Sequence, residues 1–192
     1  MNKTVSIFDY IKKLEKDMPS EEEFKKLSQR FPINPSSEIS GEINFERGML
    51  LYAIIALNKP KTIVEIGTAG GYSTLCMAWA MADFNINGKI ITIDPKSHDE
   101  KMEGINLSRK ELWEKFANKE WIKKINVITG KGMRSKNLND PYQSSDLSIL
   151  KHSVPEFVKN NSELMKKIIK IDFDSVESPS KGSFDIFLKT TK

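Results

Sequence analysis

A glycine-rich run occupies residues 64–74, which read Val-Glu-Ile-Gly-Thr-Ala-Gly-Gly-Tyr-Ser-Thr. Its first three residues end a β-branched segment, residues 61–66, of the kind expected for a parallel strand that is covered on both faces. It leads into residues 73–84, whose pattern predicts a helix. Glycine lets the backbone approach a ligand closely, and the first amides of a helix favour an anion. The run therefore predicts a ligand-binding turn between a strand and a helix.

Residues 89–94 form a second predicted strand, which ends in Asp94 just before Pro95. Strand, turn, helix and strand together make a βαβ unit with a right-handed crossover. Because the carboxyl ends of the two strands lie side by side, the Asp94 carboxylate can accept the hydroxyls of a ribose held at the turn. The turn and Asp94 together indicate a ligand that contains a nucleoside.

The residue types in the turn narrow the choice of this ligand. A dinucleotide fingerprint, G-x-G-x-x-G, does not fit around Ala69, and no Gly-Lys-Ser/Thr ending of a phosphate loop follows the strand. Glu65 can meet a cationic amino group, while the Ser73 hydroxyl and the first helix amides can take a carboxylate. An amino-acid zwitterion joined to a ribose describes S-adenosylmethionine better than NAD.

Residues 42–95 resemble the first half of a class I S-adenosylmethionine-dependent methyltransferase. The run Glu-Ile-Gly-Thr-Ala-Gly-Gly-Tyr-Ser is similar to the first motif of the catechol and caffeoyl-CoA O-methyltransferase group, and residues 45–51 resemble the helix that precedes it. The resemblance implies that the turn surrounds the methionine end of the cofactor and that Asp94 binds the ribose. The candidate cofactor-binding residues are Glu65, Gly67, Thr68, Ala69, Gly71, Tyr72, Ser73 and Asp94.

Most of these residues also have a purely structural alternative. The glycine run can be a strand-to-helix turn without a ligand, and Asp94 can be a turn former or a helix cap. The rings of Tyr72 and Trp79 are expected to pack in the core rather than to contact a substrate. Glu65 is harder to explain in this way, because an acid within an apolar strand needs a partner.

The whole chain is expected to adopt an α/β, Rossmann-like class I methyltransferase fold, with a parallel sheet and helices on both faces. Residues 1–60 are expected to form an N-terminal helical cap and a lead-in helix, and residues 61–192 a partial cofactor-binding domain with a polar insertion near 133–153. Two further strands are predicted at 125–129 and 183–188. The other predicted elements are helices at 5–17, after Ser20, at 45–57, at 108–119 and at 154–169, with a loop at 31–37.

The sequence departs from the resembled group at two strand ends. After the third strand, where methyltransferases commonly place an acidic or polar residue near the adenine, the chain has glycine, lysine and glycine at 130–132. After the fourth strand the group carries an aspartate for catalysis and often for a divalent metal. Here Lys189 follows, and Asp185 belongs to the strand itself. No catalytic residue is assigned, and a divalent metal is not supported, since His98 and His152 lack metal-ligand spacing.

The sheet is expected to be truncated after its fourth strand, because the later strands of the resembled fold are not found. The apolar strand at 183–188 would then be an edge with open hydrogen-bonding groups. Such an edge invites pairing. We therefore expect either a fragment of a longer enzyme or a protein that completes its sheet with a partner, as a homo-oligomer through this strand would.

Composition limits the class of protein. The 192 residues suffice for one domain, and the 39% of hydrophobic residues suffice for a packed core. The net charge of +4 comes without an arginine-rich run or interleaved aromatics, so nucleic acid is not an expected partner. No signal peptide or membrane-spanning segment is predicted, and the single cysteine, Cys76, cannot form an internal disulfide, so a cytoplasmic protein is expected.

These features favour an enzyme that uses S-adenosylmethionine and transfers its methyl group to the oxygen of a small hydroxylated acceptor. The alternative is a non-catalytic remnant that binds S-adenosylmethionine, or an interaction protein that completes its sheet with a partner. A dehydrogenase ranks third, because the glycine spacing does not fit.

Overall fold

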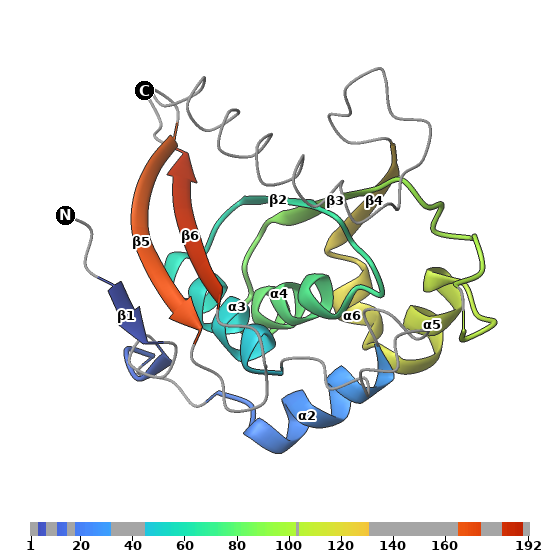
Figure 1. Cartoon of the computed structure of the whole chain (residues 1–192), viewed down its shortest axis with the longest axis horizontal. Helices are drawn as coiled ribbons and strands as arrows, with labels where there is room; N and C mark the ends of the chain where they lie inside the picture. The colour runs from blue at the N-terminus through green and yellow to red at the C-terminus, as the bar shows by residue number, and fades with distance from the viewer. Residues whose placement is uncertain are drawn as a thin grey trace. The chain divides into compact units, whose positions relative to one another are not determined.

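The computed structural model describes residues 4–6, 11–14, 18–31, 45–102, 104–130, 165–173 and 182–189, which fall into two compact units. The strands of the larger unit are β2 (Thr62–Ile66), β3 (Lys89–Asp94) and β4 (Ile125–Thr129). Its helices are α2 (Glu21–Arg30), α3 (Phe45–Asn58), α4 (Tyr72–Asp83), α5 (Arg109–Phe116) and α6 (Lys119–Ile122). The smaller unit contains β1 (Thr4–Ser6), β5 (Met165–Phe173) and β6 (Gly182–Lys189) (Figure 1).

The larger unit is built on a parallel sheet in the order β2-β3-β4. Helix α4 connects β2 to β3, and helices α5 and α6 connect β3 to β4. The register pairs Glu65 with Thr92 and Asp94 with Thr129, so the carboxyl ends of the three strands meet at one edge. The predicted βαβ unit and the predicted strand at 125–129 are therefore confirmed.

Helices α2 and α5 begin with the same capping box. In α2 the Ser20 hydroxyl accepts from the Glu23 amide, and the Glu23 carboxylate accepts from the Ser20 amide. In α5 the side chains of Ser108 and Glu111 make the same reciprocal pair. Two amides at each helix start are satisfied in this way, which fixes where the helices begin. The predicted cap at Ser20 is confirmed.

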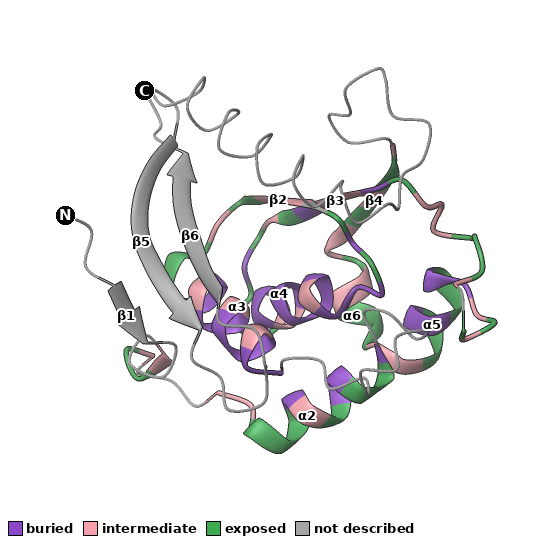
Figure 2. Cartoon of the chain, in the orientation of Figure 1, coloured by how far each residue is buried: buried purple, intermediate pink, exposed green. Residues whose placement is uncertain are grey.

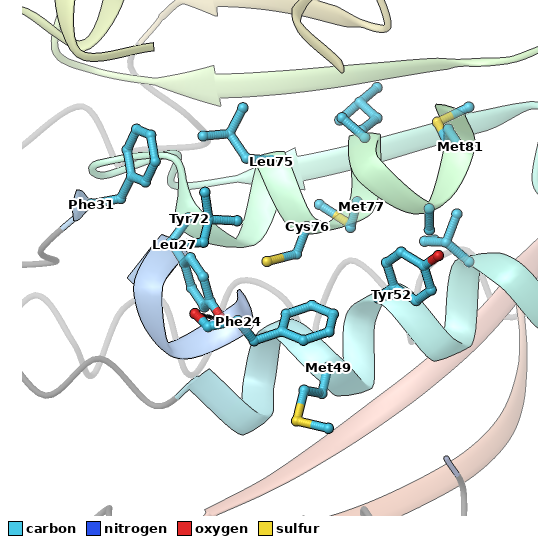
Figure 3. Close-up of a cluster of buried hydrophobic side chains, with 14 of the residues drawn as sticks. Phe24, Leu27, Phe31, Met49, Tyr52, Tyr72, Leu75, Cys76, Met77 and Met81 are labelled. Atoms are coloured by element: carbon cyan, nitrogen blue, oxygen red, sulfur yellow. Dashed lines mark hydrogen bonds between the residues drawn. The ribbon is translucent and has the colours of Figure 1, made fainter. Parts of the chain in front are cut away.

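Apolar side chains from α2, α3 and α4 form the core of the larger unit (Figure 3). Phe24, Leu50, Leu75 and Met81 are fully buried. Close packing of α3 on α4 depends on Gly48, because a Cβ at this position would collide with the Tyr72 hydroxyl and the Cys76 sulfur. The predicted helices at 45–57 and 73–84 are confirmed as α3 and α4, and this helical layer supports the sheet edge that carries the turn.

The two faces of the parallel sheet differ in burial within the described residues. Helices α3, α4 and α6 lie on one side of the sheet, and α4 is buried along most of its length (Figure 2). On the other face the side chains of Val64 and Ile128 are 62% and 41% exposed. The described helices of this unit therefore cover one face of the sheet.

The smaller unit is a three-stranded sheet in the order β1-β5-β6. Strand β1 pairs in parallel with β5, with Thr4 opposite Lys170, and β6 pairs antiparallel with β5. The strand predicted at 183–188 is confirmed as β6, but its expected place as the fourth parallel strand is wrong, since its described neighbour is β5.

Two predicted helices are wrong where the smaller unit is described. Residues 4–6 are strand β1 and not part of a helix over 5–17, and residues 165–169 belong to strand β5 and not to a helix over 154–169. From Ile169 to Phe173 apolar and charged residues alternate, which is the strand period of two. Just before this run, between Lys167 and Ile169, the pairing of β5 with β6 shifts its register. The insertion near 133–153 lies outside the described residues, and so does the loop at 31–37 apart from Phe31.

Candidate functional site

The glycine turn at the carboxyl end of β2 has an unusual backbone. Gly67, Ala69 and Gly71 all have positive φ angles, of 89°, 47° and 94°. The Gly67 amide donates to the Ile93 carbonyl at 2.8 Å, which ties the start of the turn to β3. A Cβ built on Gly67 would meet no atom within 4 Å, so the backbone faces open space there. The turn can accept a ligand at close range, as the sequence predicts.

Asp94 lies against this turn, at the end of β3. Its Oδ2 accepts from the Ala69 amide at 3.0 Å, and its Oδ1 accepts from the Lys96 amide at 2.8 Å. The Nη2 of Arg109 lies 3.2 Å from the same Oδ1. The hydrogen bonds from described residues use one acceptor position on each oxygen of Asp94, so the carboxylate keeps capacity for further donors. The structure thus brings the turn and Asp94 together.

Glu65 is held in a chain of hydroxyl groups on the helix-facing side of the sheet. Its Oε2 accepts from Thr74 Oγ1 at 2.5 Å and from Thr92 Oγ1 at 2.7 Å. Thr92 Oγ1 also lies 2.6 Å from Thr68 Oγ1. Because Thr92 has one hydroxyl hydrogen and gives it to Glu65, Thr68 must donate to Thr92. The partner that an acid in this strand requires is therefore supplied by threonines.

Burial raises the pKa of Glu65, and the hydrogen bonds from Thr74 and Thr92 offset part of that rise. The hydroxyl bonds reach Oε2, and no hydrogen bond from the described residues reaches Oε1. The Glu65 carboxylate is thus positioned by its neighbours while one oxygen keeps its acceptor capacity.

The first turn of α4 supplies further donors beside Gly67. The first helical bond runs from the Leu75 amide to the Gly71 carbonyl, so the amides of residues 72–74 precede it. Ser73 is half-buried in this turn. The positive end of a helix and its first amides favour a carboxylate.

The Tyr72 side chain points away from the turn into the core. Its hydroxyl donates to the Phe45 carbonyl at 3.0 Å, and burial raises the pKa of the phenol. The ring is 3% exposed, so the expectation that it packs in the core is confirmed. If Tyr72 contacts a ligand at the turn, it would therefore do so through its backbone amide.

Sequence reasoning missed Arg109, whose side chain contacts both halves of the site. Its Nε donates to the Ala69 carbonyl at 2.7 Å, and it pairs with Asp94 as described above. Trp113, one helical turn later, donates from Nε1 to the Gly70 carbonyl at 3.0 Å. The capping box at Ser108 predicts where α5 begins, but no signal in the sequence near it indicates that Arg109 reaches the turn.

His98 lies next to this cluster. Its ring centroid is 4.9 Å from that of Trp113, and burial lowers its pKa, with a further lowering by the Arg109 charge. In the part of the chain that the structure describes, no three His, Cys, Asp or Glu residues gather as a metal site would require. His152 and residues 131–132 lie outside the described residues.

A protein-family model described as O-methyltransferase matches residues 16–176. The match spans more than half of the 192 residues. The chain belongs to the O-methyltransferase family. The predicted resemblance to class I methyltransferases is thereby confirmed, and the catechol and caffeoyl-CoA group is consistent with it.

One solved structure agrees with this family fold, and a second is similar to a lower degree. A putative O-methyltransferase from Klebsiella pneumoniae has a TM-score of 0.50 at 15% identity, with 96% of each chain covered. An SAH-bound methyltransferase of Podospora anserina, PaMTH1, has a TM-score of 0.46 at 18% identity, with 88% of this chain and 67% of that chain covered. No curated protein matches this chain in sequence. The predicted Rossmann-like methyltransferase fold is confirmed by the first of these structures.

Within the described residues, no helix combines the length and the apolar character needed to cross a membrane.

Proposed function

We propose that this member of the O-methyltransferase family binds S-adenosylmethionine at the glycine turn and transfers its methyl group to the hydroxyl oxygen of a small acceptor. The observation that carries the proposal is the 3.0 Å hydrogen bond from Ala69 N to Asp94 Oδ2, because it joins the turn to the carboxylate at one sheet edge. A ligand that contacts both must span a backbone nest and an acidic side chain, as a nucleoside with a charged substituent does.

The residues present fit this cofactor. The open space at Gly67 admits a ligand against the backbone, and the amides of residues 72–74 suit its carboxylate. Oε1 of Glu65 suits its ammonium group, and the acceptor capacity left on the Asp94 carboxylate suits the ribose. Thr68 supports Glu65 through Thr92 instead of facing the ligand.

The bound cofactor would supply an electrophilic methyl group on a sulfonium. An acceptor oxygen would take up this methyl group in line with the breaking C–S bond, with S-adenosylhomocysteine as the leaving group and the hydroxyl proton lost to solvent. The residues of this chain would bind and orient, since catalysis by positioning can account for much of the rate of such a reaction. Charge complementarity at Glu65 would hold the ammonium group of the ligand, and hydrogen bonding at Asp94 would hold its ribose, while the acceptor approaches. No general base is assigned among the described residues.

Calorimetry with S-adenosylmethionine, S-adenosylhomocysteine and NAD tests the binding half of the proposal. We expect the first two to bind and NAD to fail. An Asp94→Ala variant should weaken binding of S-adenosylhomocysteine by about 1–3 kcal/mol, since a charged hydrogen bond to the ribose is lost. Absence of binding by the wild-type chain would overturn the proposal.

A methyl-transfer assay tests the second half. Phenolic and catecholic acceptors are offered with methyl-labelled cofactor, in parallel arms with Mg²⁺ and with chelator, and transfer of label to oxygen is expected. Binding without turnover across the panel would instead favour the non-catalytic remnant. The expectation that the strand at 183–188 mediates a homo-oligomer stays a prediction, which light scattering at high concentration tests.

A further inference from the structure

One face of helix α5 reaches back to the glycine turn. Arg109 Nε donates to the Ala69 carbonyl at 2.7 Å, and Trp113 Nε1 donates to the Gly70 carbonyl at 3.0 Å. Residues four apart lie on the same face of a helix. The same helix face therefore holds two consecutive carbonyl groups of the turn.

Arg109 also reaches the second half of the site. Its Nη2 lies 3.2 Å from Asp94 Oδ1, and only 3% of its side chain is exposed. Asp94 in turn accepts from the Ala69 amide. Arg109, Ala69 and Asp94 thus form a closed ring of contacts that joins two strand ends to α5.

Fold stability alone does not account for this arginine. Its Nη1 is buried, and it has no hydrogen-bond partner within the described part of the chain. A buried donor without an acceptor lowers stability. The contacted residue, Ala69, has a positive φ of 47°, which is costly for a residue with a Cβ. Such costs cluster where local geometry serves binding.

We propose that Arg109 is the positioning residue of the cofactor site. Through Ala69 and Asp94 it fixes the arrangement in which the turn amides and the carboxylate meet the ligand. This inference rests on the proposed function.

The variant Arg109→Met tests the inference against Lys110→Met. The control removes the same charge from the next residue of α5, where Lys110 is 52% exposed and pairs with the exposed Asp99. We expect Arg109→Met to weaken binding of S-adenosylhomocysteine about tenfold or more by calorimetry, and Lys110→Met to leave it unchanged. Wild-type affinity in Arg109→Met would overturn the inference.

A cycle with Asp94→Ala separates positioning from general destabilisation. If Arg109 acts through Asp94, adding Arg109→Met to Asp94→Ala should weaken binding by less than about threefold. If Arg109→Met weakened binding about tenfold in the Asp94→Ala variant as well, positioning through Asp94 would be contradicted.

Hydrogen exchange in the free protein keeps this inference distinct from the proposed function. Peptides that cover residues 67–74 should exchange faster in Arg109→Met and at the wild-type rate in Lys110→Met. If the wild type did not bind S-adenosylhomocysteine, the proposed function would be wrong. The exchange rates of the two variants would still decide whether Arg109 holds the turn. Unchanged exchange in Arg109→Met would show that it does not.

Two milder variants serve if Arg109→Met does not fold. Arg109→Lys keeps the charge and loses the planar fork, and Trp113→Phe keeps a ring beside Gly71 and loses the indole donor. Both should bind S-adenosylhomocysteine with affinities between those of the wild type and Asp94→Ala. Wild-type affinity in both would overturn the inference.

Discussion

The two sheets of this molecule differ in how their strands find one another along the chain. In the β2-β3-β4 sheet each strand pairs with the next one in sequence, through a helix that packs on the sheet. In the β1-β5-β6 sheet the parallel pair joins Thr4 to Lys170, at opposite ends of the sequence. Local patterns specify the first kind of pairing, whereas the second depends on contacts that no short window of sequence contains. The candidate cofactor site lies at the edge of the locally specified sheet.

The largest expected effect concerns the two ends of the glycine turn. A Cβ at Gly71 would collide with the Trp113 ring, and φ there is 94°. Gly71→Ala should cost about 4 kcal/mol of unfolding free energy, from strain together with overpacking. Gly67→Ala, at φ 89° with open space, should cost only about 1–2 kcal/mol. Denaturant unfolding measures both, and equal costs would refute the difference between the two ends.

A proline in the smaller sheet tests whether the two units are independent. Ile171 lies in β5, between β1 and β6, so Ile171→Pro removes an amide from a strand that is paired on both sides. We expect a local loss of about 2 kcal/mol, seen as faster hydrogen exchange in β5 and β6. Exchange in α4 should stay unchanged. Faster exchange in both units would contradict their independence.

Glu65→Gln should separate stability from binding inside the larger unit. Burial raises the pKa of Glu65 above its ordinary value of 4.5, so its protonation favours the folded state. That contribution is complete below pH 4.5 and is lost as the pH rises through the folded-state pKa. Glutamine does not ionise, so the variant should melt higher than the wild type near about pH 8, with a gap that closes on acidification.

The same variant should bind S-adenosylmethionine about tenfold more weakly, because it lacks the charge that faces the ligand ammonium. Thermal melting across pH and calorimetry at neutral pH measure the two effects. Glu65→Gln would count against this assignment if it melted lower at every pH or bound the cofactor as the wild type does. Asp83→Asn is a control that changes a carboxylate of α4 outside the turn.

The smallest expected effect compares two identical capping boxes. Ser20→Ala and Ser108→Ala should each cost about 1 kcal/mol of unfolding free energy, since each removes the acceptor for a helix amide. Only Ser108→Ala should also weaken cofactor binding, because α5 carries Arg109 and Trp113. Equal binding by the two variants would show that the start of α5 does not matter to the site.

The predicted half of the site followed from sequence because it is local. Gly67 and Asp94 belong to consecutive strands of one βαβ unit, so their meeting at one edge follows from the order of elements. Arg109 could not be placed in the same way. Its role depends on how α5 docks over the turn, and helical periodicity indicates only that Leu112 and Trp113 face inward. Threonine partners for Glu65 also depend on the register of two strands.

The wrong helix predictions in the smaller sheet have a related physical cause. Strand β1 spans Thr4–Ser6, and so short a segment has no period to detect. In β5 the apolar residues Met165, Ile168 and Ile169 have the i, i+3, i+4 spacing of a helix face, and the pairing with β6 shifts register at the same place, between Lys167 and Ile169. Secondary-structure preference was overridden there by pairing with distant strands, as is common for β-structure.

Cys76 gives this molecule a chemical reporter of its own opening. It is the single cysteine of the chain, it lies fully buried between α3 and α4, and burial raises the pKa of its thiol. An alkylating reagent can therefore label the native protein only when that helix pair separates. The labelling rate counts separations of α3 from α4, and a tightly bound cofactor should slow it in proportion to its occupancy.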